Sequence, residues 1–147
     1  MMPHCPFCNP AVIKNESFYQ SKHSRILYNI KPIFEGHVLV ITIKHRERLE
    51  NLTSKEKSDL FETVTRCNKI LCKTYKKDSY SIVIQDGKGA GQTVPHFHIH
   101  IIPMNSSMKT KEVMKKLDEN IFRQKISEEK MKTEIARLKK TAKSILR

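Results

Sequence analysis

The sequence predicts an α+β protein in which five strands and one long helix form a domain, followed by a helical C-terminal extension. Three observations support this prediction: short β-prone runs within residues 17–42 and 80–103, an amphipathic stretch over 54–76, and renewed helical periodicity after residue 107. With 147 residues, the chain has the length of one domain. We therefore divide it into a domain over residues 1–107 and a basic helical extension over residues 108–147.

The first three strands are predicted as a meander within residues 17–42. Residues 18–19 and 26–28 are short β-prone runs, and residues 37–42 are nearly continuously apolar. A proline and a glycine place a turn between residues 31 and 36.

A long helix is predicted next, over residues 54–76. Thr53 and Glu56 have the spacing of a capping box, in which a hydroxyl and a carboxylate bind two unpaired amides at a helix start. We expect Cys67 and Cys72 to be buried as small apolar groups. The predicted apolar stripe of this helix consists of Leu60, Phe61, Val64, Cys67, Leu71 and Tyr75.

The remaining strands are predicted at residues 80–85 and 96–103, and they flank a segment that holds three of the four glycines. Two helical blocks follow, the second starting near Ser127. Their apolar positions are Val113, Met114, Leu117 and Ile121 in the first block, and Ile135, Leu138, Ala142 and Ile145 in the second.

The charge of the chain favours polyanionic partners. Lys and Arg number 28 against 15 acidic residues, a net charge of +13, and residues 104–147 carry +7 of it. We expect the extension to be a solvated basic helix face, with a nucleic-acid surface as the less favoured alternative. No apolar run is long enough for a signal peptide or a membrane span, so we expect an intracellular protein, cytoplasmic or nuclear, with no membrane partner.

Three histidines alternate with apolar residues near the end of the predicted sheet. In a strand, His96, His98 and His100 share one face, whereas Phe97 and the residues that alternate with the imidazoles face a core. Spacing alone leaves a metal cluster and a catalytic surface equally open. The preceding residues 89–94 supply small residues, an amide and a hydroxyl suited to phosphate oxygens, which favours the catalytic alternative.

Two segments resemble the histidine triad (HIT) family of nucleotide hydrolases and transferases. Residues 85–103 contain the pattern His-φ-His-φ-His-φ-φ preceded by Gly-Gln-Thr-Val, and residues 29–41 form a second matching block. The motif is most similar to the fragile histidine triad branch, which cleaves dinucleoside polyphosphates. The resemblance covers residues 5–103 and implies a HIT-like fold, a five-stranded antiparallel sheet with the long helix packed on it.

The resemblance also implies site residues, a purine nucleotide substrate and a homodimer that pairs through the helix and one strand. His98 would be the nucleophile that takes up a nucleoside monophosphate, with His37 near the same imidazole. The groups that would hold phosphate oxygens or protonate the leaving group are Gln85, Gln92, Thr93 and His100. The nucleoside contacts would be Asn29 at the ribose and Ile26 and Leu39 at the base.

A C-x₂-C pair, Cys5 and Cys8, lies at the start of the domain and can supply half of a metal site. The fragile histidine triad branch generally lacks this pair, but the resemblance to bacterial-type HIT proteins implies that His45 and His96 complete a closed, structural Cys₂His₂ zinc site. Free thiols without metal remain the alternative, and His4 is an alternative ligand. His23 is expected at the surface.

Three functions stay open on the sequence. The first is a hydrolase that cleaves at the α-phosphate of a dinucleoside polyphosphate or a nucleoside phosphoramidate. The second is removal of adenylate from a nucleic-acid end, with the basic extension contacting the backbone. The third is a nucleotide-binding module.

Overall fold

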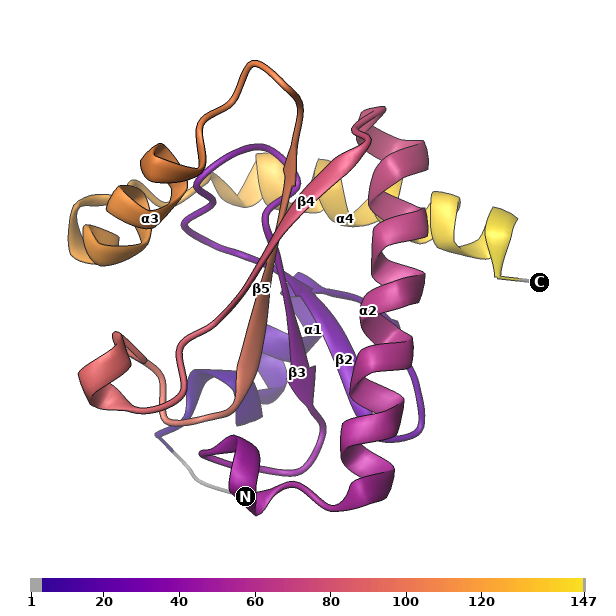
Figure 1. Cartoon of the computed structure of the whole chain (residues 1–147). Coiled ribbons are helices and arrows are strands. Elements are labelled where there is room, and N and C mark those ends of the chain that lie inside the picture. The colour runs from indigo at the N-terminus through magenta and orange to yellow at the C-terminus, as the bar shows by residue number, and fades with distance from the viewer. Residues whose placement is uncertain (1–3, 147) are drawn as a thin grey trace.

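The computed structural model describes residues 4–146, so the outermost residues of the two predicted regions, 1–3 and 147, lie outside it. Its centre is one antiparallel sheet in the order β1-β2-β3-β5-β4 (Figure 1). The strands are β1 (Ser17–Gln20), β2 (Ser24–Tyr28), β3 (Val38–Thr42), β4 (Ser79–Ile84) and β5 (His98–Met104). The predicted five-stranded α+β fold is confirmed. His96 precedes β5 instead of starting it, because the chain turns between Val94 and His96.

The helices are α1 (Pro10–Glu16), α2 (Ser54–Tyr75), α3 (Thr110–Asp118) and α4 (Glu128–Ile145). The capping box of α2 forms as predicted, since Thr53 Oγ1 accepts from the Glu56 amide at 3.2 Å and the Glu56 carboxylate accepts from the Thr53 amide at 2.8 Å. Within residues 4–146, no helix is both long and apolar enough to cross a membrane.

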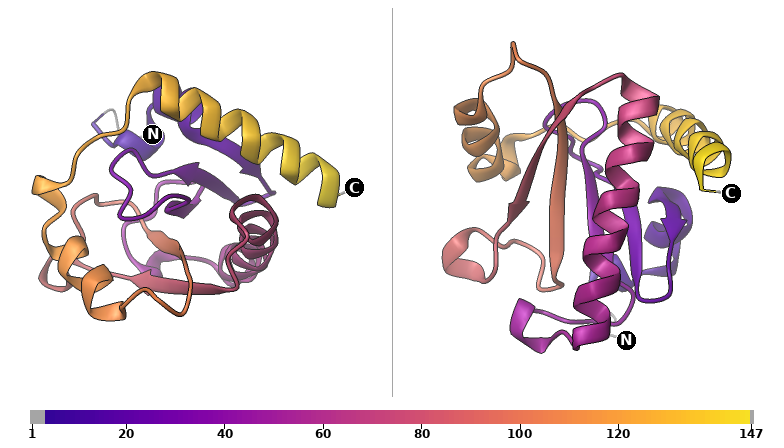
Figure 2. Two further views of the ribbon diagram at one scale, coloured as in Figure 1. Left: turned by 90° about the horizontal axis from the view of Figure 1, so that it is seen from above. Right: turned by 45° about the vertical axis from the view of Figure 1, so that its right-hand side comes forward.

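One face of the sheet packs against α2 and α4 (Figures 1 and 2). Strand residues such as Tyr28, Val40 and Ile99 meet Leu60 and Leu71 of α2 in a single apolar core. From α4, the same core takes Met131, Ile135, Leu138 and Ala142. The extension is therefore built into the domain core through α4.

Polar contacts also fix α4 to the C-terminal end of α2. The Tyr75 hydroxyl donates to the buried carboxylate of Glu134, whose other oxygen lies 2.9 Å from Lys130 Nζ. Arg137 donates to the Thr74 carbonyl at 2.8 Å. A buried carboxylate needs such partners because desolvation disfavours its charge.

The opposite face of the sheet is covered at its two ends by different segments. Phe7 and Cys5 pack on Leu39 and Ile41 at one end. At the other end, α3 packs Val113 and Leu117 on the end of β5. His98 and His100 lie on this face between the two covers, because side chains alternate along β5.

Several predicted core positions are wrong. Cys72 is exposed, and Phe61 is 51% exposed although both lie on α2. Met114, within α3, is also exposed. Ile121 is 76% exposed because α3 ends at Asp118 and its periodicity does not extend to residue 121.

Candidate functional site

A cavity of about 310 Å³ opens beside the two imidazoles of β5. Its walls come from the N-terminal segment, the loop after β4, and the segment that follows α3. The predicted site residues that line it are Asn29, Leu39, Gln85, Thr93, His98 and His100. Chain segments far apart in the sequence thus converge on one side of the sheet.

His98 presents an unprotonated ring nitrogen to this space. It pairs with Ile41 in the ladder and is 6% exposed. Its Nδ1 lies 2.7 Å from the backbone oxygen of His96, which can only accept, so Nδ1 carries the proton and Nε2 the lone pair. Burial lowers the pKa of His98, which favours the neutral, nucleophilic ring.

His100 is set in the opposite tautomer by a short relay. The Ile33 amide donates to His37 Nδ1 at 3.0 Å, so His37 carries its proton on Nε2. That Nε2–H donates to His100 Nδ1 at 3.0 Å, which leaves the proton of His100 on Nε2. The site therefore contains one ring with a free lone pair, able to act as a nucleophile, and a second ring with an N–H donor.

Both relay histidines are held neutral. Burial lowers the pKa of His100 to about 3 and that of His37 well below its usual range. The neighbouring imidazoles and the Arg123 guanidinium add to this effect, because positive charge disfavours a second cation nearby.

The loop between β4 and β5 brings donors to the cavity. Gln85, Gly91 and Thr93 line it. Gly91 has φ +95°, and a Cβ there would lie 2.5 Å from Gln85 Nε2, so the glycine permits both the turn and the close approach. The predicted ligand Gln92 does not line the cavity. Its amide braces the loop instead, accepting from the Gly87 amide and donating to the carbonyls of Glu47 and Val94.

Of the three residues predicted to contact a nucleoside, two line the cavity and one does not. Asn29 accepts from the Lys31 amide, and its nitrogen lies 3.3 Å from His37 Nε2. Leu39 lines the cavity, but Ile26 faces the α2 core and not the cavity, because it pairs with Val40 on the other face of the sheet. Other apolar residues that line the cavity include Phe7, Val12 and Ile30, which no local pattern in the sequence identified.

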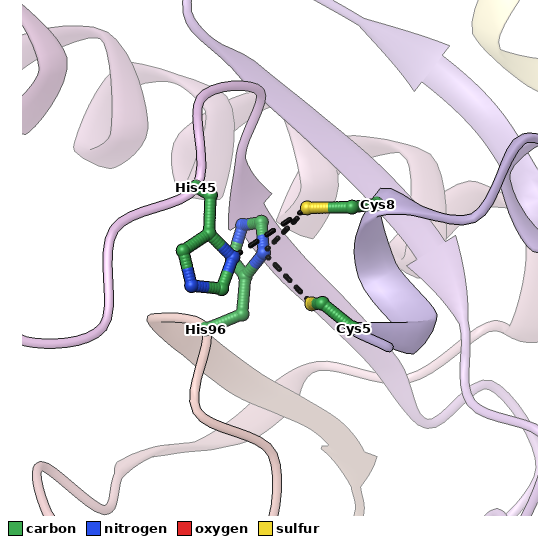
Figure 3. A group of neighbouring side chains, drawn as sticks. All are labelled: Cys5, Cys8, His45 and His96. Atoms are coloured by element: carbon green, nitrogen blue, oxygen red, sulfur yellow. Dashed lines mark hydrogen bonds between the residues drawn. The ribbon is translucent and has the colours of Figure 1, made fainter. Parts of the chain in front are cut away.

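A second cluster lies at the start of β5 (Figure 3). It gathers Cys5, Cys8, His45 and His96, whose ligand atoms all lie within 4.8 Å of one another. These are the four residues predicted for zinc. His4 is exposed and outside this group, and His23 is partly buried rather than at the surface.

The cluster fits a tetrahedral metal ion. His96 Nε2 lies 2.8 Å from the Thr42 carbonyl oxygen, so it carries the proton and Nδ1 turns its lone pair toward both thiols. The Sγ–Nδ1 distances are 3.4 Å for Cys5–His96, 3.6 Å for Cys8–His96 and 3.5 Å for Cys8–His45. A tetrahedron with Zn–S bonds of 2.3 Å and Zn–N bonds of 2.0–2.1 Å has S–N edges of about 3.6 Å.

The HIT domain family model matches residues 11–107. The chain belongs to the HIT family. A bis(5'-nucleosyl)-tetraphosphatase [asymmetrical] from Schizosaccharomyces pombe is 42% identical over 69% of the chain and 56% of its own length. The nitrilase and fragile histidine triad fusion protein NitFhit of Caenorhabditis elegans is 46% identical over 58% of the chain and 20% of its own length. The HIT match therefore spans about half of the first relative and a fifth of the second.

A solved structure from Plasmodium falciparum extends the likeness to the whole fold. This diadenosine triphosphate hydrolase, in complex with Cyclomarin A, is 30% identical and has a TM-score of 0.72. The match covers 91% of the HIT chain described here and 80% of the Plasmodium chain. The prediction of a HIT protein similar to the fragile histidine triad branch, but with a Cys-x-x-Cys pair, is confirmed.

Proposed function

We propose that this protein hydrolyses dinucleoside polyphosphates at the α-phosphate, with His98 as the nucleophile. The observation that supports it most is the pair of opposite tautomers on β5: a lone pair on His98 Nε2 beside an N–H on His100 Nε2. The named activities of the yeast and Plasmodium relatives, which act on dinucleotide tetraphosphates or triphosphates, support the same substrate class.

In the first step, His98 Nε2 bonds to the α-phosphorus while the bond from phosphorus to the bridging oxygen breaks. The remaining nucleotide leaves with the electron pair of that bond. The Nε2–H of His100 stabilises the charge on the phosphate oxygens or on the leaving oxygen. Covalent catalysis of this kind divides one difficult displacement into two easier ones.

In the second step, water bonds to phosphorus and the P–N bond breaks. The electron pair returns to His98 Nε2 and restores its neutral ring, the proton of the attacking water passes to solvent, and a nucleoside monophosphate is released. Gln85 and Thr93 are proposed to hold the phosphate oxygens, and Asn29 the ribose hydroxyls. Gln92 braces the loop between β4 and β5, which carries Gln85 and Thr93.

The substrate is best tested with a panel of diadenosine triphosphate, diadenosine tetraphosphate, adenosine phosphoramidate and 5′-adenylated DNA, with products separated by chromatography. We expect the diadenosine polyphosphates to be cleaved fastest, with adenosine monophosphate as one product. Faster release from adenylated DNA would replace the proposal with the nucleic-acid alternative. Binding of all four without turnover would support the binding-module alternative.

We further propose that Cys5, Cys8, His45 and His96 hold a structural zinc ion. Two thiolates and two imidazoles form a closed site, in which the ion would pin the N-terminal segment to the residue before β5. Elemental analysis of the purified protein should give about one zinc per chain. A value near zero would favour free thiols.

We propose finally that the protein is a homodimer that pairs through α2 and β4. β4 is the edge strand next to β5, and Phe61, Ile82 and Ile84 leave apolar area exposed on these two elements. Sedimentation analysis should give twice the chain mass, and Ile82→Lys should give the chain mass. A monomeric wild type would contradict this proposal.

A further inference from the structure

Basic side chains from outside the matched family segment reach the cavity of His98. Arg123 and Lys125 lie in the chain between α3 and α4, and both line the cavity together with Lys31. Glu16 is the acidic residue among the lining groups, and burial raises its pKa to about 7, so at neutral pH it is about half ionised and offsets at most one of these three positive charges.

Arg123 is fixed by three hydrogen bonds from different atoms of its guanidinium. Nε donates to the Lys31 carbonyl at 2.9 Å, Nη1 to the Lys116 carbonyl at 2.7 Å, and Nη2 to the Asn120 side-chain oxygen at 2.8 Å. These partners belong to three segments of the chain. The guanidinium is therefore positioned by the fold before any ligand arrives.

With these three partners, the guanidinium of Arg123 keeps its positive charge and has unused N–H donors. All of them are oxygens of neutral groups, so none cancels the positive charge. A guanidinium has five N–H donors, and two remain after these contacts. Partial burial also lowers the pKa of Arg123, and an anion bound there would offset that desolvation.

Arg123 lies close to two of the site histidines. Its charge is felt by His100 and His37, the two rings of the N–H relay. Arg123 and His100 also line the same cavity, so the guanidinium lies near the ring whose N–H is proposed to stabilise phosphate oxygens or the leaving oxygen.

We propose that Arg123 is the core of a polyphosphate subsite, which binds the phosphates beyond the one that His98 attacks. Lys125 and Lys31 add positive charge at the same cavity. Bonds between a guanidinium and phosphate oxygens are charge-assisted and directional. The subsite selects substrates with a chain of phosphates over those with a single phosphate, and it rests on the proposed function.

The test compares kcat/KM for diadenosine tetraphosphate with kcat/KM for adenosine phosphoramidate, which has no phosphate beyond the attacked one. Because the ratio of the two cancels any loss of folded enzyme, it is insensitive to instability of a variant. Arg123→Gln should lower this ratio about 10- to 100-fold, in line with the loss of a charged hydrogen bond. Lys111→Gln, which removes an exposed charge from the same extension, should change it less than about twofold. An unchanged ratio in Arg123→Gln would show that Arg123 only holds the fold together.

A binding measurement separates this proposal from the proposed function. Inorganic tripolyphosphate is titrated into the wild type, Arg123→Gln and Lys111→Gln by calorimetry. We expect Arg123→Gln alone to weaken binding about tenfold or more, with adenosine monophosphate bound equally by all three. If the wild type cleaves no substrate but this pattern appears, the subsite stands and the hydrolase proposal fails. If tripolyphosphate binds all three proteins equally, the subsite is wrong whatever the activity.

Discussion

Two histidine clusters lie on the same face of the sheet, and they differ in what surrounds them. His96, just before β5, has two thiols and a third ligand within metal-binding distance. His98 and His100, within β5, have an open cavity and a backbone-anchored relay. The partners of these histidines therefore give the same side chain two different settings: a lone pair directed at a closed cluster, or a lone pair beside an open cavity.

The clusters are also joined. The carbonyl of His96 accepts the hydrogen bond from His98 Nδ1–H that fixes the tautomer of His98. The Phe7 ring, between the two cysteines, makes edge contacts with His96 at 5.8 Å and with His98 at 5.3 Å between ring centroids. The conformation of the Cys₂His₂ cluster should therefore affect the position of His98, through the hydrogen bond to the His96 carbonyl and through the Phe7 ring.

The largest expected effect is the loss of activity on substitution of His98, compared with substitution of His96 in the other cluster. His98→Asn removes the proposed nucleophile and should lower kcat by about 10⁴-fold or more, while nucleotide binding and the melting temperature stay near the wild-type values. His96→Asn should instead lower the melting temperature and the zinc content. Turnover rates, calorimetric binding and thermal melts check both. Equal activity losses with equal instability would erase the distinction between the clusters.

Removal of the metal should give the next largest effect. Metal-binding free energy at a structural site adds to folding free energy, so chelation should lower the melting temperature by about 10 °C or more. Cys5→Ser should do the same without chelator, whereas Cys72→Ser, at an exposed thiol outside the cluster, should leave it unchanged. Thermal melts with and without chelator measure this. A chelator-insensitive wild type would contradict a structural ion.

Breaking the relay should have a smaller effect on catalysis. His100→Gln removes an N–H aimed at the cavity and should lower kcat about 10²- to 10³-fold. His37→Gln leaves the His100 ring in place but alters the contact that sets its orientation and tautomer, and should lower kcat about tenfold, with little change in KM. Steady-state kinetics on one substrate provides the comparison. A larger loss of kcat in His37→Gln than in His100→Gln would contradict the arrangement in which His100 faces the cavity and His37 acts through it.

The smallest effect is a pH dependence of stability. The pKa of His100 is lowered to about 3 and that of His37 is also lowered, so between about pH 6.5 and pH 4 the unfolded chain binds more protons than the folded one. The free energy of unfolding should therefore fall on acidification, by up to about 1.4 kcal/mol per pH unit and group. Urea titrations at pH 7, 6 and 5 should show a flatter profile for His100→Gln than for His23→Gln, which lies outside the relay. Identical profiles would rule out a neutral buried His100.

How far the sequence predicts this molecule depends on the range of each signal. The alternation around His98 and the capping box at Thr53 are local, and the predicted sheet and α2 agree with the structure. The short helix α1 was missed because its seven residues carry no periodic apolar stripe. The prediction that Ile26 contacts the nucleobase is wrong because the sequence of a single strand does not reveal which of its faces turns to the cavity.

The predicted zinc ligands come together in space, but that prediction drew on the family resemblance and not on spacing alone. Arg123 had no signal in the sequence. Its place beside the histidines depends on the way the chain returns from α3 to α4, and on contacts across 92 residues to Lys31. Contacts of this range follow from tertiary packing, which no local pattern encodes.

The central claim, that His98 receives the nucleoside monophosphate, is tested most directly by trapping the covalent adduct. The wild type is mixed with diadenosine tetraphosphate, quenched within milliseconds in alkali, digested, and analysed by mass spectrometry. We expect an adenylate mass increment on His98 in the wild type and in Arg123→Gln, and no such increment in His98→Asn. An adduct on His96, on His100 or on any residue other than His98 would contradict it.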